Sequence, residues 1–272
     1  MIRKVHIAPV GFEFDRIIEG VVHHPCNVIY FLKSYKELTS EADPDKEMIE
    51  IAKRYVDNLE AHFINSRICT PIVIETLLIQ LEPIIEELCR IISKEINEYH
   101  ADEIWINVST STKLFVSAAM YVGSFKHELV KLFYIDASHY TVNDLFNPEI
   151  KKKEIREKFE KYGITYKENE ESYRNIDVPV YPTEVLTEQK KDILKALRKL
   201  THGDVGEMIT FMNLLKELGQ DPYDKTIKMK YGHHIRALKA RNFMIEKTHG
   251  RQKKFGLTHE GQILGLILTY FG

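Results

Sequence analysis

A hydroxyl-rich turn ending in a lysine is the part of the sequence best suited to holding an anion. The apolar run Ile104–Val108 leads into Ser-Thr-Ser-Thr at 109–112, then Lys113 and a helical pattern. At the carboxyl ends of parallel strands, free amides at a helix N-terminus attract phosphate. Ser109, Thr110, Ser111 and Thr112 would add hydroxyl donors, and Lys113 a mobile positive charge. A serine that caps the helix beside a solvated lysine is the equally favoured alternative.

A second turn of the same kind follows the first candidate strand, at residues 8–16. If the two strands are neighbours, the two turns lie side by side, and Gly11 would allow backbone to approach a ligand closely. Taken alone, Gly11 is more typical of a tight turn. The sequence lacks both the G-x-G-x-x-G dinucleotide fingerprint and the G-x-x-x-x-G-K-[ST] phosphate loop, so NAD binding and ATP hydrolysis lose support.

The histidine and cysteine patterns argue against a metal site. The histidines that invite such an interpretation are His6, His23, His24, His233 and His234. Adjacent histidines on a helix point about 100° apart, and no H-E-x-x-H motif occurs. The three cysteines are odd in number and form no C-x-x-C pair, so neither a zinc site nor a disulfide framework is indicated. No Ser/His/Asp or Cys/His triad can be assembled from the sequence, because triads are defined by spatial geometry.

We expect a cytoplasmic protein that does not cross a membrane. Free cysteines fit a reducing compartment. Met1–Val10 alternates charged and apolar side chains and has no signal-peptide core. The apolar run Gly261–Gly272 is twelve residues long, below the ~18 that suggest a membrane span.

The first half of the chain alternates short β-rich runs with helical patterns, which is typical of a parallel sheet. The predicted strands are Lys4–Pro9, Asn27–Lys33, Arg67–Val73, Glu103–Val108 and Val130–Asp136. The predicted helices are 12–23, 43–64, 76–98 and 111–125; the third has the clearest apolar stripe. We therefore expect an α/β class protein with a Rossmann-like domain at 1–146.

The alternation is predicted to stop near Asp136. Residues 147–185 contain a charged run at 151–161 and two nearby prolines, and are predicted to be a helical or extended connector. Helices then follow at Thr187–Leu200, capped by Thr187, at 204–218, ending at Gly219, and at Tyr223–Ala240. Strands at Phe243–Lys247 and Lys253–Leu257 and a last apolar helix from Thr258 complete a predicted winged helix-turn-helix domain at 186–272. The last helix either fills the core of this domain or pairs with a second copy.

Charge separates the two halves. The chain has 272 residues and a net charge of −2, but 186–272 carries 16 Lys and Arg against 9 Asp and Glu, a net +7, and the remainder carries −9. One basic domain beside an acidic one is expected when only one of them meets nucleic acid. The predicted DNA-binding residues are Lys225, Lys228, Lys230, Tyr231, His233, His234, Arg236, Lys239, Arg251, Gln252, Lys253 and Lys254. The alternative is a basic helical domain that only dimerises.

Over nearly its whole length the chain resembles archaeal transcription regulators with an N-terminal CRISPR-associated Rossmann fold (CARF) domain and a C-terminal winged helix. The resemblance rests on Val5–Asp15, on Ile106–Lys113, and on the order of the two domains. The second segment is similar to the family's N-x-[ST]-G-G-x-[KR] turn. Where many relatives have glycines this chain has Thr110 and Ser111, which leaves less room for a ligand to approach the backbone.

The resemblance implies a CRISPR-linked homodimer that binds a cyclic oligoadenylate, possibly cyclic tetraadenylate, and controls transcription through double-stranded DNA. It implies that the ligand lies against Pro9, Gly11, Phe12, Asn107, Ser109, Thr110, Ser111, Thr112 and Lys113. No cofactor, no metal and no catalytic residue is predicted, and a regulator is favoured over an enzyme. Two alternatives remain: a ring nuclease that cleaves cyclic oligoadenylate, and a DNA-binding dimer that needs no ligand.

Overall fold

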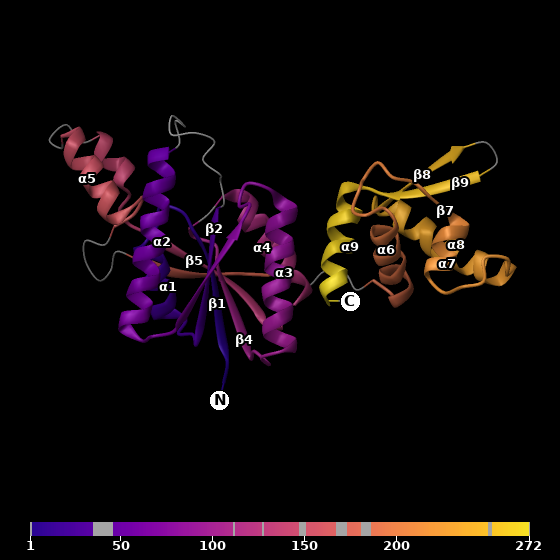
Figure 1. Cartoon of the computed structure of the whole chain (residues 1–272), viewed down its shortest axis with the longest axis horizontal. Helices are drawn as coiled ribbons and strands as arrows, with labels where there is room; N and C mark the ends of the chain where they lie inside the picture. Colours follow the sequence, from indigo (N-terminus) through magenta and orange to yellow (C-terminus); the bar gives the residue numbers. More distant parts are fainter. Residues whose placement is uncertain are drawn as a thin grey trace. The chain divides into compact units, whose positions relative to one another are not determined.

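The computed structural model describes residues 2–34, 46–110, 112–126, 128–146, 151–166, 173–180, 186–249 and 252–271. The chain divides into two compact units, Met1–Pro182 and Thr183–Gly272 (Figure 1). No helix in the described parts of the chain combines the length and the hydrophobicity that a membrane span requires.

The first unit is built on a mostly parallel sheet. Its strands are β1 (Lys4–Val10), β2 (Val28–Ser34), β3 (Thr70–Thr76), β4 (Glu103–Asn107), β5 (Val130–Ala137) and β6 (Tyr173–Val178). They are ordered β3-β2-β1-β4-β5-β6; β1 to β5 run parallel, and β6 runs antiparallel to β5. This arrangement confirms the predicted Rossmann-like α/β fold. The order reverses between β1 and β4, and open α/β sheets bind ligands beside the carboxyl ends of two such strands, a place hereafter called the crevice.

Helices cover both faces of this sheet. They are α1 (Asp15–His23), α2 (Lys46–Ser66), α3 (Leu81–Asn97) and α4 (Lys113–Phe125). Figure 1 shows α1 and α2 on one side and α3 and α4 on the other. The central strands are buried on both faces, since β1 is buried from Val5 to Val10, which explains why their sequences are continuous apolar runs.

The segment expected as a connector contributes to the first unit instead. After β5 come a 3-10 helix, η1 (Thr141–Phe146), helix α5 (Lys152–Tyr162), residues 163–166, and then β6 on the edge of the sheet. Sequence patterns missed β6 because it is short, half of its residues are polar, and it pairs only with β5. Its stability depends on long-range pairing, which leaves no local periodicity.

Backbone contacts fasten η1, α5 and residues 163–166, hereafter the arm, to the turn after β1. The Ile164 N–H donates to the Phe12 carbonyl at 2.8 Å, and the Thr141 N–H donates to the Ile164 carbonyl at 2.8 Å. Gly163 adopts φ 89° and ψ −151°, a region that is essentially restricted to glycine. A Cβ at this position would lie 2.0 Å from the Phe12 carbonyl oxygen. Only glycine fits where the arm crosses the turn.

The C-terminal end of α4 is packed closely against the segment that follows β6. A Cβ at Gly123 would lie 2.9 Å from Leu132 Cδ1 and 3.4 Å from Val180 Cγ1. Helix α4 therefore extends from the turn after β4 to a contact with the chain as it leaves the first unit.

The second unit combines helices with a small antiparallel sheet. Its elements are α6 (Glu188–Leu200), β7 (Ile209–Thr210), α7 (Phe211–Glu217), α8 (Lys225–Ala240), β8 (Met244–His249), β9 (Gln252–Leu257) and α9 (His259–Phe271). The strands form an antiparallel sheet ordered β7-β9-β8. The helix predicted at 204–218 begins only at Phe211, because β7 pairs with β9 just before it and the Thr210 hydroxyl caps α7. Thr187 does occupy the N-cap of α6, without a capping bond from its side chain.

Helix α9 belongs to the core of the second unit. Its residues from Gly261 to Leu268 are buried, and it packs on α6. The buried Gln262 amide donates to the Thr201 hydroxyl at 3.2 Å, and its oxygen accepts from Arg198 at 3.1 Å. Of the two alternatives for this helix, the structure shows the filled core.

Gly163→Ala is expected to destabilise the first unit by more than about 2 kcal/mol, because the strained backbone alone costs ~1–3 kcal/mol. Gly11→Ala is the matched control: its Cβ would meet the Thr110 carbonyl at 3.5 Å, an ordinary contact. Urea unfolding followed by the fluorescence of Trp105, the single tryptophan, reports on this unit. Equal losses in the two variants would contradict the close packing inferred for position 163.

Candidate functional site

The two turns singled out in the sequence lie next to each other at the crevice between β1 and β4. Ile7 and Ile106 are partners in neighbouring parallel strands, so the turn after β1 and the turn after β4 emerge at the same edge. The Thr110 hydroxyl donates to the Pro9 carbonyl at 2.6 Å and joins them directly. Gly11 lies beside the Thr110 carbonyl. This is where open α/β sheets bind ligands.

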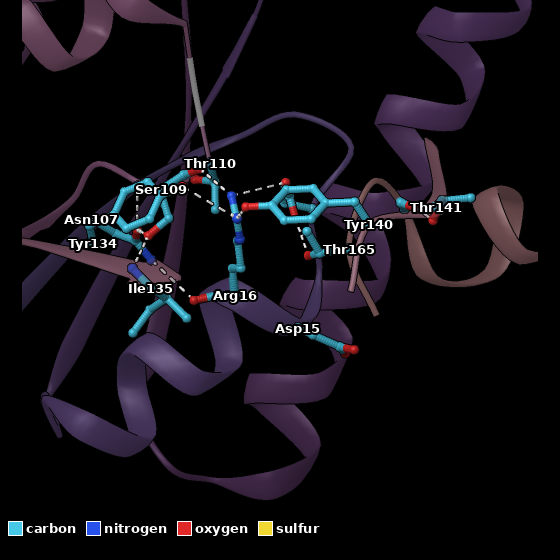
Figure 2. Close-up of polar contacts among 12 residues, drawn as sticks. Asp15, Arg16, Asn107, Ser109, Thr110, Tyr134, Ile135, Tyr140, Thr141 and Thr165 are labelled. Carbon is cyan, nitrogen blue, oxygen red and sulfur yellow. Dashed lines mark hydrogen bonds and ion pairs between the residues drawn. The ribbon is translucent and has the colours of Figure 1, made fainter. Parts of the chain in front are cut away.

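Asn107 and Ser109 hold the second turn in shape (Figure 2). The buried Asn107 Oδ1 accepts from the Ser109 N–H at 2.9 Å and from the Ser109 hydroxyl at 2.5 Å. Its amide nitrogen donates to the Arg16 carbonyl at 3.2 Å, and the Ser109 hydroxyl accepts from the Ile135 N–H at 2.6 Å. Because these polar atoms already have partners, both residues shape the site more than they offer free donors.

Thr112 and Lys113 begin helix α4 at the mouth of the crevice. The Thr112 hydroxyl accepts from the Phe115 N–H at 3.3 Å, so Thr112 is the helix cap, whereas one of the two sequence alternatives gave this role to a serine of the turn. Lys113 is exposed in the first turn of α4, where an anion meets both its charge and the helix dipole. Ser111 lies outside the described residues.

A buried arginine that sequence reasoning missed lies behind this turn. Arg16 Nη1 donates to the Ser109 carbonyl at 2.9 Å, and Nη2 donates to the Tyr140 hydroxyl at 2.5 Å (Figure 2). The Tyr134 hydroxyl lies 3.5 Å from Nη2, and Nε has no partner among the described residues. An arginine in the first turn of an amphipathic helix gives no sequence signal of burial, since arginine is mostly exposed.

Glu13 completes the buried cluster. Its carboxylate lies 3.5 Å from Arg16 Nη1 and accepts from the Thr165 hydroxyl at 2.5 Å. Burial raises the pKa of Glu13, while the Arg16 charge and the Thr165 hydrogen bond act to lower it. Through Thr165 and Tyr140 the cluster ties the arm to both turns. In the sequence, only the i, i+3 spacing of Glu13 and Arg16 distinguished them from other charged residues. That spacing does not reveal Thr165 and Tyr140, which lie more than a hundred residues away in the chain.

The remaining predicted ligand residue, Phe12, turns toward the arm. Its ring lies 5.6 Å from the Phe159 ring of α5, centroid to centroid. The Thr112 hydroxyl also donates to the Leu78 carbonyl at 3.3 Å, so the groups of the two turns that a ligand could contact are Lys113, the backbone at Gly11 and the first amides of α4. Lys113 and the amides are suited to phosphate. We find no nucleophile hydrogen-bonded to a general base among the described residues of these turns.

The predicted DNA-binding residues fall into three groups. Those exposed on α8 and the wing are Lys225, Lys230, His233, Arg236, Gln252 and Lys253; those half-buried are Lys228, His234, Lys239 and Lys254. Tyr231 is buried in the core of the second unit, and Arg251 lies outside the described residues.

An acidic residue joins helix α8 to strands β8 and β9. Glu246 of β8 forms ion pairs with Lys239 of α8 and with Lys253 of β9, the latter at 2.8 Å. Hydrogen bonds from Lys239 and then Lys253 lower its pKa. Two of the predicted DNA-binding lysines are thus paired with a carboxylate.

Comparison with known proteins gives a family and several solved structures, two of which are described below. Residues 4–140, about half of the chain, match the family model described as HFX_2341_N-like, N-terminal. No curated protein matches the chain. Csm6 from Enterococcus italicus, solved with cyclic hexa-2'-fluoro-hexa-dAMP, is 11% identical with a TM-score of 0.39, over 89% of this chain and 57% of that one. Can2 from Sulfobacillus thermosulfidooxidans, solved with cyclic tetra-adenylate, is 11% identical with a TM-score of 0.32, over 99% and 63%. The chain thus spans less than two thirds of either.

Arg16→Met should destabilise the first unit, by roughly 1–3 kcal/mol, because the Ser109 carbonyl loses a charged donor. The loss of stability relative to the wild type should be larger at about pH 8 than at about pH 5. Without the Arg16 charge, the folded-state pKa of Glu13 lies further above its unfolded-state value. A group whose pKa is raised by folding lowers the stability of the folded state as the pH rises. Urea unfolding followed by Trp105 fluorescence at both pH values measures this. The double variant Arg16→Met, Glu13→Gln should lose this additional pH dependence, because no carboxylate remains at position 13. If Arg16→Met loses the same stability at both pH values, the inferred coupling between Glu13 and Arg16 is wrong.

Proposed function

The chain belongs to the HFX_2341_N-like, N-terminal family, and from its site we propose that it is a homodimeric transcription regulator that senses a cyclic oligoadenylate. The observation that supports this most directly is the pairing of the two turns at the β1–β4 crevice, with Lys113 and the N-terminus of α4 at its mouth. The resemblance to CARF regulators with a winged helix supplies the class of ligand. The first unit would bind the nucleotide and the second unit DNA.

The chemistry of the crevice favours phosphate groups. The amides of the first turn of α4 and the Lys113 ammonium group supply positive potential. The buried bonds of Asn107, Ser109 and Thr110 fix the turn before a ligand arrives, so little ordering entropy is lost on binding.

A second copy of the chain fits the exposed face of α4. Leu114 is 40% exposed and Met120 42% exposed, and after Lys113 the helix carries no charged residue. An apolar helix face of this kind is typical of an interface. Because α4 begins at the crevice, two-fold pairing through this face would bring two Lys113 residues to one symmetric site, and a cyclic oligonucleotide with an even number of repeats shares that symmetry.

The second unit would bind DNA through α8 and the wing. Lys230, His233 and Arg236 are exposed along one helix, and Gln252 and Lys253 are exposed on the adjoining strand. A recognition helix in the major groove with a wing on the neighbouring backbone uses this distribution.

The ligand is tested by measuring the melting temperature with cyclic di-, tri-, tetra- and hexaadenylate, because a ligand that binds only the folded protein raises it. One ring size should do so, and Lys113→Ala should weaken that ligand by about tenfold or more, the value of a charge-assisted phosphate contact. Lys153→Ala, an exposed lysine of α5, is the control. The solution mass of the same samples tests the homodimer. The proposed sensor function would be wrong if no cyclic oligoadenylate raised the melting temperature, or if the increase were the same in Lys113→Ala as in the wild type.

The DNA interface is tested by removing the acid that holds two of its lysines. Glu246→Gln frees Lys239 and Lys253, so affinity for duplex DNA should rise and the slope of log K against log salt should steepen by about 1 to 2. Glu260→Gln, an exposed acid in the first turn of α9, changes the net charge equally and is the matched control. Equal effects of the two substitutions would mean that only the net charge is sensed and that the wing does not contact DNA.

A further inference from the structure

Two cysteines meet at the amino edge of the sheet, the end opposite the candidate ligand site. Cys26 lies just before the start of β2, and Cys69 just before the start of β3. These strands are neighbours, with Val28 opposite Thr70, and the ladder continues because the Thr70 N–H donates to the Asn27 carbonyl at 2.9 Å. Both side chains pack in one hydrophobic cluster. Both are free thiols.

The two thiols have unequal surroundings. Cys26 is 8% exposed, whereas Cys69 is more accessible. Donation from the Cys26 thiol lowers the pKa of Cys69, and the same hydrogen bond, with burial, raises the pKa of Cys26. The accessible sulfur therefore ionises first, and a thiolate is the form that reacts with oxidants.

We propose that Cys26 and Cys69 are a thiol oxidation site that a hydroperoxide converts into a reversible intramolecular disulfide. Cys69 acts as the attacking sulfur and Cys26 as the resolving one. Continuing the ladder sets Cys69 opposite Asn27, one residue along from Cys26. With strands ~4.8 Å apart and a rise of ~3.3 Å per residue, regular geometry gives a Cα separation of about 5.8 Å, and disulfides join Cα atoms ~4.4–6.8 Å apart.

The reaction balances with hydrogen peroxide as the oxidant. The Cys69 thiolate attacks one peroxide oxygen, the O–O bond breaks, and the departing hydroxide takes up a proton to become water, leaving a sulfenic acid on Cys69. The Cys26 sulfur then attacks the Cys69 sulfur, the S–O bond breaks, and the Cys26 proton leaves with the hydroxyl group as a second water. Two thiols are oxidised and one peroxide is reduced; an external dithiol reverses the step by thiol–disulfide exchange.

The third cysteine provides an internal control. Cys89 is fully buried in α3 and packs away from the other two; burial raises the pKa of its thiol. It shares the redox conditions of the chain without sharing the site. We expect it to stay reduced under conditions that oxidise the pair.

The test treats the reduced full-length chain with hydrogen peroxide, alkylates it in denaturant without reductant, and maps its peptides by mass. A Cys26–Cys69 linked peptide is expected in the wild type and in Cys89→Ser, and should be lost in Cys26→Ser and in Cys69→Ser. Trp105 fluorescence checks that each variant is folded, and Cys69→Ala replaces Cys69→Ser if the serine is not accommodated.

A second readout separates the two roles. In peroxide-treated Cys26→Ser, a 1,3-dione probe should trap a sulfenic acid on Cys69, whereas Cys69→Ser should show none on Cys26. Recovery of Cys26 and Cys69 as alkylated thiols from the oxidised wild type would overturn the proposal. So would a sulfenic acid on Cys26, or linkage of Cys69 only to a second chain.

Discussion

A guanidinium removed from water must find its hydrogen-bond acceptors inside the protein, and the carboxyl edge of the sheet is arranged around those of Arg16. Its acceptors come from distant parts of the chain: the Ser109 carbonyl from the turn after β4, and the Tyr140 hydroxyl from the residue just before the arm. Glu13 adds a carboxylate, which Thr165 holds from the end of the arm. No one of these segments can move alone without leaving a buried charge unsatisfied, so the turn, the helix and the arm behave as one body.

The polar residues of the site fall into two groups: residues whose hydrogen bonds fix the shape of the turn, and groups that a ligand could contact. Asn107, Ser109 and Thr110 give their hydrogen bonds to the backbone around them, and the groups that remain toward the crevice are Lys113 and the amides that begin α4. A turn fixed in this way is preorganised for an anion. The structure separates serines and threonines that look equivalent in the sequence.

An element could be predicted from the sequence when its stabilising contacts leave a local pattern, and could not when its partners lie far away in the chain. Central strands and covering helices were predictable to within a few residues, because strands buried on both faces and helices with one apolar stripe carry their own periodicity. The edge strand β6 and the arm were not predictable, since both are held by partners far away in the chain. The burial of Arg16 was not predicted for the same reason. Tyr231 shows the opposite error: it was predicted to contact DNA because α8 is rich in basic residues, but it is buried in the core of the second unit.

Helix α4 gives this architecture a mechanical property. Its thirteen residues form a rod about 20 Å long, whose first turn lies at the crevice and whose last turn is wedged at Gly123 between Leu132 and Val180. A rod that is packed at its far end does not absorb a push; it passes the displacement on. Helix α4 therefore connects, by direct packing, the turn that follows β4 with the stretch of chain that leads out of the first unit.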